Sequence, residues 1–201
     1  MAISWTEVTV LSDQVLARGS TVKATLDLTA KLGAWLMLAF GRGGTTALTN
    51  GVNWEIRPRN QASAVGSHPG AARTSRISSS AACNSTTVST TSNAGQAVLT
   101  VASGTGFAAG QIICIQDSGG GVTRLEWARV SKISGGTITL DDNLQYTHTS
   151  GQADTVRNQA DVFDKIWLDP GLVWDVLADY GDDTAGESIT LRAIAKRWDS
   201  V

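Results

Sequence analysis

Alternation of apolar and polar residues with a period of two is the feature that most restricts how this chain folds. The residues from Thr21 to Ala30 alternate strictly, which is typical of a half-buried antiparallel strand. The run Ala34–Phe40 is apolar throughout and is followed by glycines, as expected for a central strand of a sandwich. No segment keeps a helical period for more than a turn or two. The sequence therefore predicts an all-β protein.

The strand patterns fall into three stretches of the 201-residue chain. Residues 1–60 and 152–201 each supply too few strands to close a sandwich alone, so we expect them to form one discontinuous immunoglobulin-like or jelly-roll β-sandwich. Residues 86–151 contain five short strands punctuated by glycines, which predicts an inserted small SH3-like β-barrel. Residues 61–85 are rich in Ser and Ala and are expected to be a flexible arm or linker.

Six of the seven tryptophans fall into two expected groups. Trp35, Trp54, Trp167 and Trp174 lie in strand patterns and are expected to fill the sandwich core. Trp5 and Trp198 lie near the two chain ends, where an aromatic residue often anchors a terminus or contacts a subunit. A carbohydrate-binding surface would instead need such rings exposed in a row.

Charge is distributed unevenly although the net charge is only −2. The first hundred residues carry a balance of +4 and the remainder −6, and no acidic residue occurs between Glu55 and Asp117. This gap holds four arginines, so the segment is our candidate for docking to a charged partner surface. A solvated loop with scattered charge is the alternative. The candidate partner-binding residues are therefore Arg57, Arg59, Arg73 and Arg76, together with Trp5 and Trp198.

Catalytic and metal-binding patterns are not found in the sequence. Two cysteines, Cys83 and Cys114, and two histidines, His68 and His148, give little material for a zinc cage or for histidine-based catalysis. A Cys83–Cys114 bridge is compatible with the sequence, although Cys114 is expected as a free thiol in the barrel core. We interpret His148 as a surface or hydrogen-bonded residue. The sequence thus predicts a protein that is not an enzyme and has no cofactor, metal or specific nucleic acid.

Acidic pairs and a glycine-rich stretch are interpreted as turns. Asp141–Asp142 and Asp182–Asp183 lack the looped spacing that supplies six to eight oxygens to calcium. Residues Gly104–Gly110 do not have the dinucleotide-binding spacing and precede a strand rather than a helix. The N-terminus lacks the pattern of a signal peptide, and no apolar run is long enough for a transmembrane helix.

Parts of the sequence resemble tailed-bacteriophage virion proteins. Both ends of the chain resemble phage virion proteins with an immunoglobulin-like sandwich, through Thr21–Leu28, Gly33–Leu36, Phe40–Gly44, Ser188–Ala195 and Trp198–Val201. The centre is similar to small β modules of tailed-phage structural proteins, through Ala97–Val101, Gly106–Gln111, Glu126–Val130 and Thr137–Leu140.

This resemblance implies a non-enzymatic virion protein, with a capsid decoration (cement) protein as the first choice. Such a protein would bind the major capsid protein or other virion proteins as a dimer or trimer and stabilise the head shell. It would be located in the virion, after assembly in the host cytoplasm. The alternatives are a neck, head–tail connector or fibre-adaptor protein and, from another class, a carbohydrate-binding β-sandwich module.

Overall fold

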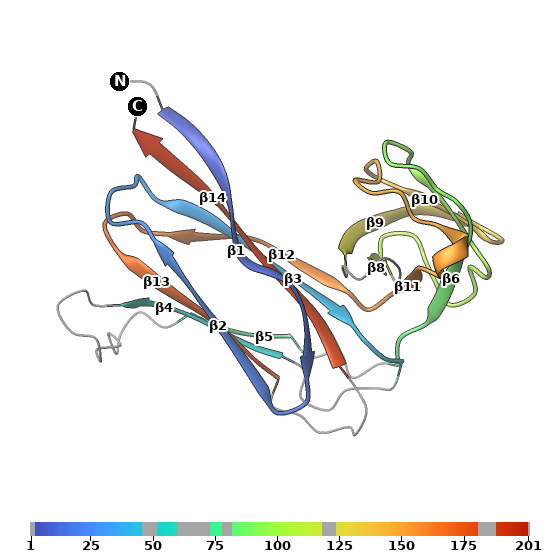
Figure 1. Ribbon diagram of the computed structural model, residues 1–201, viewed down its shortest axis with the longest axis horizontal. Coiled ribbons are helices and arrows are strands. Elements are labelled where there is room, and N and C mark those ends of the chain that lie inside the picture. Colours follow the sequence, from blue (N-terminus) through green and yellow to red (C-terminus); the bar gives the residue numbers. More distant parts are fainter. Residues whose placement is uncertain are drawn as a thin grey trace.

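The chain folds into two lobes built from β-strands. The computed structural model describes residues 3–45, 52–59, 73–77, 82–117, 124–180 and 188–200. Figure 1 shows an elongated sandwich with a smaller barrel beside one end of it. Within the described residues the only helix is the short 3₁₀ turn η1 (Ser150–Gln152), and no helix is long and apolar enough to cross a membrane. The all-β prediction is confirmed.

Within the described part of the chain, eight strands form the sandwich as two four-stranded antiparallel sheets. One sheet has the order β1-β14-β3-β12 and the other β2-β13-β4-β5. The strands of the first sheet are β1 (Ile3–Ala17), β3 (Ala34–Arg42), β12 (Asp161–Leu168) and β14 (Ser188–Ser200). Those of the second are β2 (Ser20–Asp27), β4 (Val52–Arg59), β5 (Arg73–Ile77) and β13 (Val173–Tyr180).

The pairing order identifies the sandwich as a jelly roll. When the eight sandwich strands are taken in chain order, the first pairs with the last (β1 with β14), the second with the seventh (β2 with β13), the third with the sixth (β3 with β12) and the fourth with the fifth (β4 with β5). One long antiparallel ribbon wrapped over itself gives this nesting, which is the arrangement of eight-stranded jelly rolls. Of the two sandwich types expected from sequence, the structure therefore has the jelly roll.

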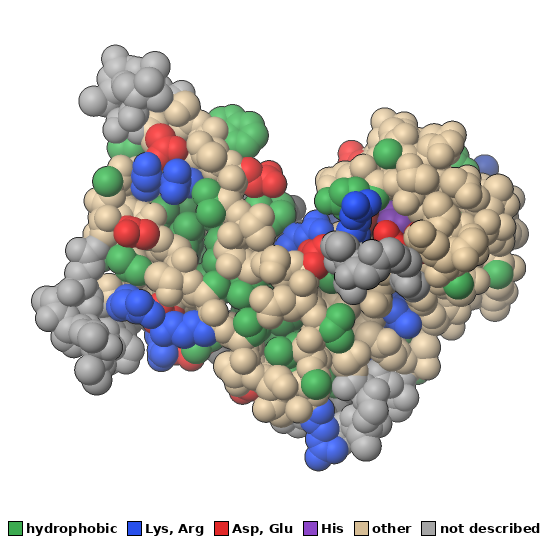
Figure 2. Space-filling model, viewed as in Figure 1, with side chains coloured by type: hydrophobic (Ala, Val, Ile, Leu, Met, Phe, Trp, Pro, Cys, Tyr) green, Lys and Arg blue, Asp and Glu red, His purple; other side chains and the backbone are tan. Residues whose placement is uncertain are grey.

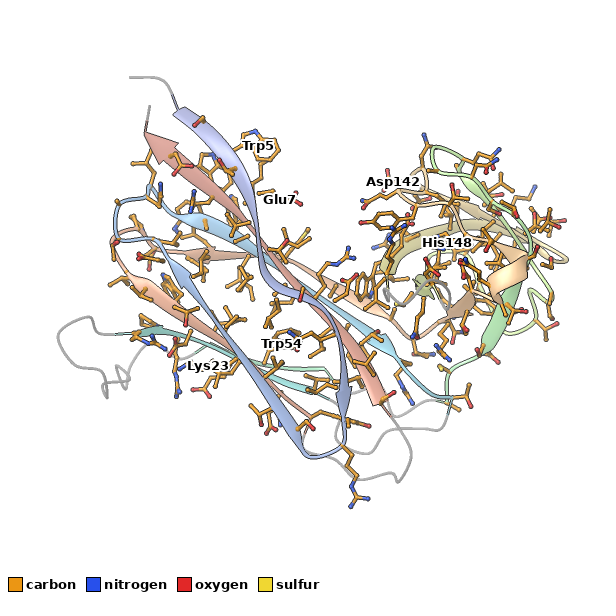
Figure 3. All side chains as sticks on the ribbon, in the orientation of Figure 1. Trp5, Glu7, Lys23, Trp54, Asp142 and His148 are labelled. Atoms are coloured by element: carbon orange, nitrogen blue, oxygen red, sulfur yellow. The ribbon has the colours of Figure 1, made fainter. Side chains whose placement is uncertain are left out.

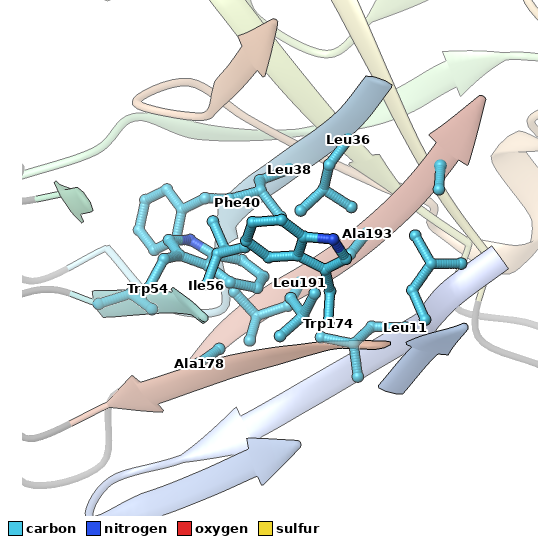
Figure 4. Close-up of a cluster of buried hydrophobic side chains, with 14 of the residues drawn as sticks. Leu11, Leu36, Leu38, Phe40, Trp54, Ile56, Trp174, Ala178, Leu191 and Ala193 are labelled. Carbon is cyan, nitrogen blue, oxygen red and sulfur yellow. The ribbon is translucent and has the colours of Figure 1, made fainter. Parts of the chain in front are cut away.

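Both sheets contribute to one apolar core, which Figure 4 shows between them. Phe40 from the first sheet and Trp54 and Trp174 from the second are almost completely buried. The expectation that four tryptophans fill this core is wrong for Trp35 and Trp167. In β3 the inward side chains are Leu36 and Leu38, and a strand that is apolar on both faces does not reveal which face points inward.

The second lobe is a closed six-stranded barrel with its own core. The strand order around it is β10-β7-β6-β11-β8-β9. Its strands are β6 (Ser85–Thr90), β7 (Val98–Val101), β8 (Ile112–Gln116), β9 (Leu125–Ser134), β10 (Thr137–Leu140) and β11 (Thr155–Arg157). All five strands expected from sequence are present, and β11 adds a sixth from a stretch that we assigned to the sandwich. That the two lobes are separate domains, and that the barrel is SH3-like, stays a prediction.

The barrel is inserted between β5 and β12, and its two connections to the sandwich are joined to each other. The backbone N–H of Asn84 donates to Asn158 Oδ1 over 2.7 Å, and the N–H of Asn158 donates to the Asn84 carbonyl over 3.2 Å. Both side-chain amides also donate to the carbonyl of Gly106. Gly106 has φ +84°, and a Cβ there would collide with Asn84, so the glycine-rich stretch serves as a structural turn.

Part of the expected arm is ordered into a strand. Residues Arg73–Ile77 form β5, which pairs with Val52–Ile56 of β4 at the edge of the second sheet. Arg73 and Arg76 therefore belong to the sandwich by backbone position, which corrects the expectation of an irregular arm at these five residues. Main-chain pairing with β4 supplies the order that the Ser-rich composition does not indicate. Of the rest of the expected arm, residues 61–72 and 78–81 lie outside the described residues, and residues 82–85 lead into β6, which begins at Ser85.

Neither cysteine forms a disulfide, and both side chains are buried. Cys114 is not in the barrel core as expected: its Sγ lies 3.7 Å from Thr190 Oγ1 of the sandwich strand β14. Burial raises the pKa of the Cys114 thiol to about 12. A Cβ at Gly41 would lie 2.8 Å from the Cys114 sulfur, so Gly41 allows the barrel to approach the first sheet closely.

Candidate functional site

The outer face of the sheet β1-β14-β3-β12 carries a cluster of aromatic side chains. Cross-strand pairing puts Trp5 opposite Trp198, and Trp35 opposite both Lys196 and Trp167, so all these side chains share one face. Trp5 is 55% exposed, Met37 39% and Trp35 37%. We call this surface the tryptophan face and define it as Trp5, Trp35, Met37, Trp167, Trp198 and Lys196.

Ring contacts organise the tryptophan face. Trp35 and Trp167 meet edge to face with ring centroids 5.0 Å apart, and Trp167 is 5.9 Å from Trp198. The Lys196 ammonium lies 3.8 Å from the Trp5 ring centroid. These contacts hold the rings in defined positions while leaving Trp5 and Trp35 accessible, which is the condition for a rigid aromatic anchor in an interface.

The outer face of the other sheet, β2-β13-β4-β5, is polar and charged; we call it the charged face. Asp175 at its centre is paired with Lys23 at 2.8 Å and with Arg59 at 2.7 Å. Arg57 pairs with Glu55 at 3.0 Å. In Figure 3 Trp5 and Glu7 project from β1 on the side where the barrel lies, whereas Lys23 lies on the opposite side of the sandwich.

The structure thus separates the residues that we predicted as one docking group. Trp5 and Trp198 lie together on the tryptophan face. Arg57 and Arg59 lie on the charged face, where both are engaged in ion pairs. Arg73 and Arg76 lie in β5 at the edge of the same sheet, opposite Ile56 and Asn53 of β4. Whether any of the six binds a partner stays a prediction.

A pocket of about 450 Å³ lies where the tryptophan face runs under the barrel. The space-filling view in Figure 2 shows the surface indented between the two lobes. The sandwich wall comes from β1, β3 and β14, and the barrel wall from β9 and the segment after β10. We call it the junction pocket; it is lined by Glu7, Thr9, Ser12, Asp13, Met37, Ala39, Arg192 and Ile194 of the sandwich and by Glu126, Trp127, Gln145 and Tyr146 of the barrel.

An ion pair at the base of the junction pocket joins the lobes. Arg192 binds Asp13 through two contacts, Nε to Oδ1 at 2.5 Å and Nη2 to Oδ2 at 2.7 Å. The pair then holds both backbone groups of Leu125 in β9: its N–H donates to Asp13 and its carbonyl accepts from Arg192. Trp127 Nε1 donates to the Phe40 carbonyl over 2.9 Å, and the Arg192 guanidinium lies over the Trp127 ring at 5.0 Å.

Behind the barrel wall, a buried histidine bridges two carboxylates. His148 Nε2 lies 3.0 Å from Glu126 and Nδ1 lies 3.2 Å from Asp154. Burial by itself lowers the pKa of His148, but the hydrogen bonds and charges of Glu126 and Asp154 outweigh it and raise the pKa above the ordinary value of 6.5. Glu126 also accepts from the backbone N–H groups of Gln145 and Tyr146. This network therefore fixes the segment that supplies two pocket residues.

Sequence reasoning missed the junction pocket and the partners of His148. His148 and Glu126 are 22 residues apart, and no local motif joins them; only barrel closure brings them together. Asp13 and Arg192 come from opposite ends of the chain and meet because the first and last strands of a jelly roll pair. The local sequence gives no clear signal, since Asp13 lies in the polar stretch Ser12–Gln14 between Leu11 and Val15.

The described residues contain no metal-binding cluster. No group of three His, Cys, Asp or Glu side chains in these ranges is arranged to hold a metal ion. Glu126 and Asp154 bind opposite nitrogens of the His148 ring, so the three do not converge on one point. Asp182 and Asp183 lie outside the described residues.

Comparisons with known proteins do not assign the chain to a family. No family model matches it, and no curated protein matches it. Among solved structures, it is similar at 10% identity to VP17, a capsid protein of bacteriophage P23-77, over 100% of both chains with a TM-score of 0.18. It is also similar at 10% identity to a structure of infectious bursal disease virus Gt strain, over 97% of this chain and 79% of that one, with a TM-score of 0.24.

Proposed function

We propose that this protein is a structural component of a phage particle that docks onto other virion proteins through its tryptophan face. The observation that carries the proposal is the exposure of Trp5, Trp35 and Met37 on the outer face of a sandwich sheet. Such a face is normally polar, and contiguous exposed apolar surface marks interaction sites. Tryptophan and methionine are also enriched at protein interfaces.

The jelly roll supports the same proposal. This architecture is common among viral capsid and lectin domains, although a fold by itself does not define a function. The resemblance of the sequence to tailed-phage virion proteins favours the capsid class. The particular role that we propose is decoration of the head shell, in which the protein contacts several capsid subunits and stabilises the shell.

Partner binding is expected to follow the usual energetics of an interface. A few buried aromatic anchors supply most of the affinity, each contributing about 2 kcal/mol or more. Binding of a dimer or trimer to a repeated shell would raise the apparent affinity through effective concentration. The outward position of Trp5 and Trp35 fits them as anchors, because docking would remove from water rings that the free protein leaves exposed.

Binding to particles that lack this protein tests the proposal. Wild-type protein should co-sediment with such particles to saturation, and the double variant Trp5→Ala/Trp35→Ala should bind at least about 30-fold more weakly. The matched control is Arg57→Ala/Arg59→Ala on the charged face, which should bind like the wild type if the tryptophan face docks. Normal binding by the tryptophan variant would contradict the proposal, and loss of binding only in the arginine variant would favour the basic segment instead.

Copy number separates decoration from the alternative role at the neck, connector or fibre adaptor. Negative-stain images of particles saturated with the protein should show it spread over the whole shell. A single ring of density at one vertex would instead support the neck or connector role.

A further inference from the structure

The polar side chains of the junction pocket divide into two sets. The first set already has partners inside the protein: Asp13 and Arg192 bind each other, and Glu126 binds His148 and two backbone N–H groups. The second set consists of side chains whose polar atoms make no hydrogen bond or ion pair with any described residue: Glu7, Thr9, Ser12, Gln145 and Tyr146. The partnered set forms a rigid floor, and the second set is available to a ligand.

Charge in the pocket is nearly balanced. The Asp13 carboxylate is offset by Arg192 at 2.5 Å, and Glu126 lies 3.0 Å from the His148 ring. Glu7 is exposed, and Lys196, opposite it in the strand register, is directed over Trp5. A strongly ionic ligand would therefore find no large opposite charge.

The available groups instead suit a ligand that both donates and accepts hydrogen bonds. The hydroxyls of Thr9, Ser12 and Tyr146 and the amide of Gln145 can each do both, and Glu7 accepts. Two aromatic rings, Trp127 and Tyr146, line the barrel side of the same pocket. A guanidinium lies over each ring, Arg192 at 5.0 Å from the Trp127 centroid and Arg124 at 5.6 Å from the Tyr146 centroid, so one ring face of each is left for a ligand. Its volume of about 450 Å³ lies within the range of roughly 300–1,000 Å³ found for small-molecule sites.

We propose that the junction pocket binds a small neutral saccharide, of one to two pyranose rings. Sugar hydroxyls both donate and accept hydrogen bonds, and the C–H face of a pyranose packs against an aromatic ring. This assignment differs from the carbohydrate surface considered from sequence, which required tryptophan rings exposed in a row. It does not require docking through the tryptophan face, although the pocket and that face share Met37.

An extended peptide is the competing ligand, and the shape of β1 disfavours it. A peptide that adds to a sheet edge needs a regular ladder of free N–H and C=O groups. The register of β1 with β14 is interrupted twice, between Thr9 and Leu11 and between Leu11 and Gln14. Such bulges break a regular edge and redirect side chains, and here Ser12 and Asp13 both line the pocket.

Titration of the intact, ¹⁵N-labelled protein with methyl glycopyranosides tests this proposal. The panel contains methyl glucoside, galactoside, mannoside and N-acetylglucosaminide, each to about 50 mM, because a single sugar unit is expected to bind with a Kd near 1–10 mM. The reporter is the indole N–H of Trp127, which donates to the Phe40 carbonyl. At least one glycoside should shift this signal saturably.

Two variants and one control locate the site. Tyr146→Ala removes a ring but keeps the backbone N–H that Glu126 binds, and we expect it to raise the Kd at least about fivefold. Thr9→Val removes only a hydroxyl and should raise the Kd about two- to fivefold. Trp35→Ala on the tryptophan face should bind the glycoside like the wild type. The proposal is overturned if no glycoside shifts the signal, if both pocket variants bind unchanged, or if only the capped peptide Ac-Ala-Ala-Ala-NH₂ binds.

Discussion

The two outer faces of the jelly roll have the same strand geometry and opposite chemistry. On the charged face, Asp175 is surrounded by Lys23, Arg59 and a Thr25 hydroxyl, so its carboxylate is fully paired on a surface that is suited to water. On the tryptophan face, rings and a methionine side chain stay exposed at one end while the barrel covers the other. Folding alone does not require exposed aromatic rings, because a sandwich sheet needs one apolar face against the core and can have a polar face toward water. This difference between the faces is the basis of the docking proposal.

The largest expected difference between the two sheets is the loss in the free energy of unfolding when one arginine on each outer face is replaced by alanine. Arg192→Ala leaves Asp13 partly buried without its cation and removes a contact to Leu125, so we expect a loss of about 3 kcal/mol in the free energy of unfolding. Arg59→Ala on the charged face leaves Asp175 paired with Lys23 and should cost less than about 1 kcal/mol. Urea titration followed by circular dichroism measures both.

Hydrogen exchange in the same pair of variants shows where the loss occurs. Arg192→Ala should increase exchange at the start of β9, at the Leu125 N–H that Asp13 accepts from. Equal costs in the two variants would mean that the contact between sandwich and barrel adds nothing beyond an exposed ion pair.

The next largest loss in the free energy of unfolding is expected when the buried His148 is replaced. Because its pKa in the folded protein is raised above the ordinary 6.5, its contribution to stability is fully present below about pH 6.5 and is lost as the pH rises through the folded-state pKa. His148→Gln should cost about 2 kcal/mol near pH 6, since two buried carboxylates lose hydrogen bonds to a cation. Urea midpoints measured from pH 5 to 9 should fall with rising pH in the wild type and much less in the variant; parallel curves would contradict this account.

The strands were predictable from sequence because their residues carry a local signal. The period of two in Thr21–Ala30 identified β2, and the apolar run Ala34–Phe40 identified β3 as a central strand. The exposure of Trp35 was not predictable, because an apolar run gives no information about which face of the strand is covered. The strand β5 was missed for a related reason: Arg73–Ile77 is ordered by main-chain pairing with β4, which its composition does not indicate.

Asp175 on the charged face is expected to change stability with pH in the direction opposite to His148. Burial raises the pKa of Asp175, but the hydrogen bonds and charges of Lys23 and Arg59 outweigh it and hold the pKa below the ordinary value of 3.8. This carboxylate therefore contributes stability above about pH 3.8 that is lost as the pH falls through the folded-state pKa. Asp175→Asn should cost about 1 kcal/mol at pH 7 and flatten the acid limb of the stability curve. An unchanged acid limb in urea titrations at pH 2 to 5 would contradict this assignment.

The functional candidates needed the fold because their members come from distant parts of the chain. The tryptophan face joins Trp5, Trp35, Trp167 and Trp198, which only the pairing of β1, β14, β3 and β12 places together. Sequence reasoning selected Trp5 and Trp198 by their position near the termini, but it could not associate them with the other two rings. The junction pocket is still less accessible, since its two walls belong to different lobes.

A matched pair of substitutions, one on each face, should change stability least and compare the binding roles of the two faces most directly. Met37 and Leu177 occupy comparable places, Met37 opposite Ile194 on the tryptophan face and Leu177 between Lys23 and Glu55 on the charged face. Replacing either with Thr in a strand should change the free energy of unfolding by less than about 0.5 kcal/mol, because both side chains point outward and Thr suits a strand. Only Met37→Thr should weaken binding to particles, by about fivefold. If Leu177→Thr weakens binding as much, the tryptophan face is not the docking surface, since the loss would then be common to both faces.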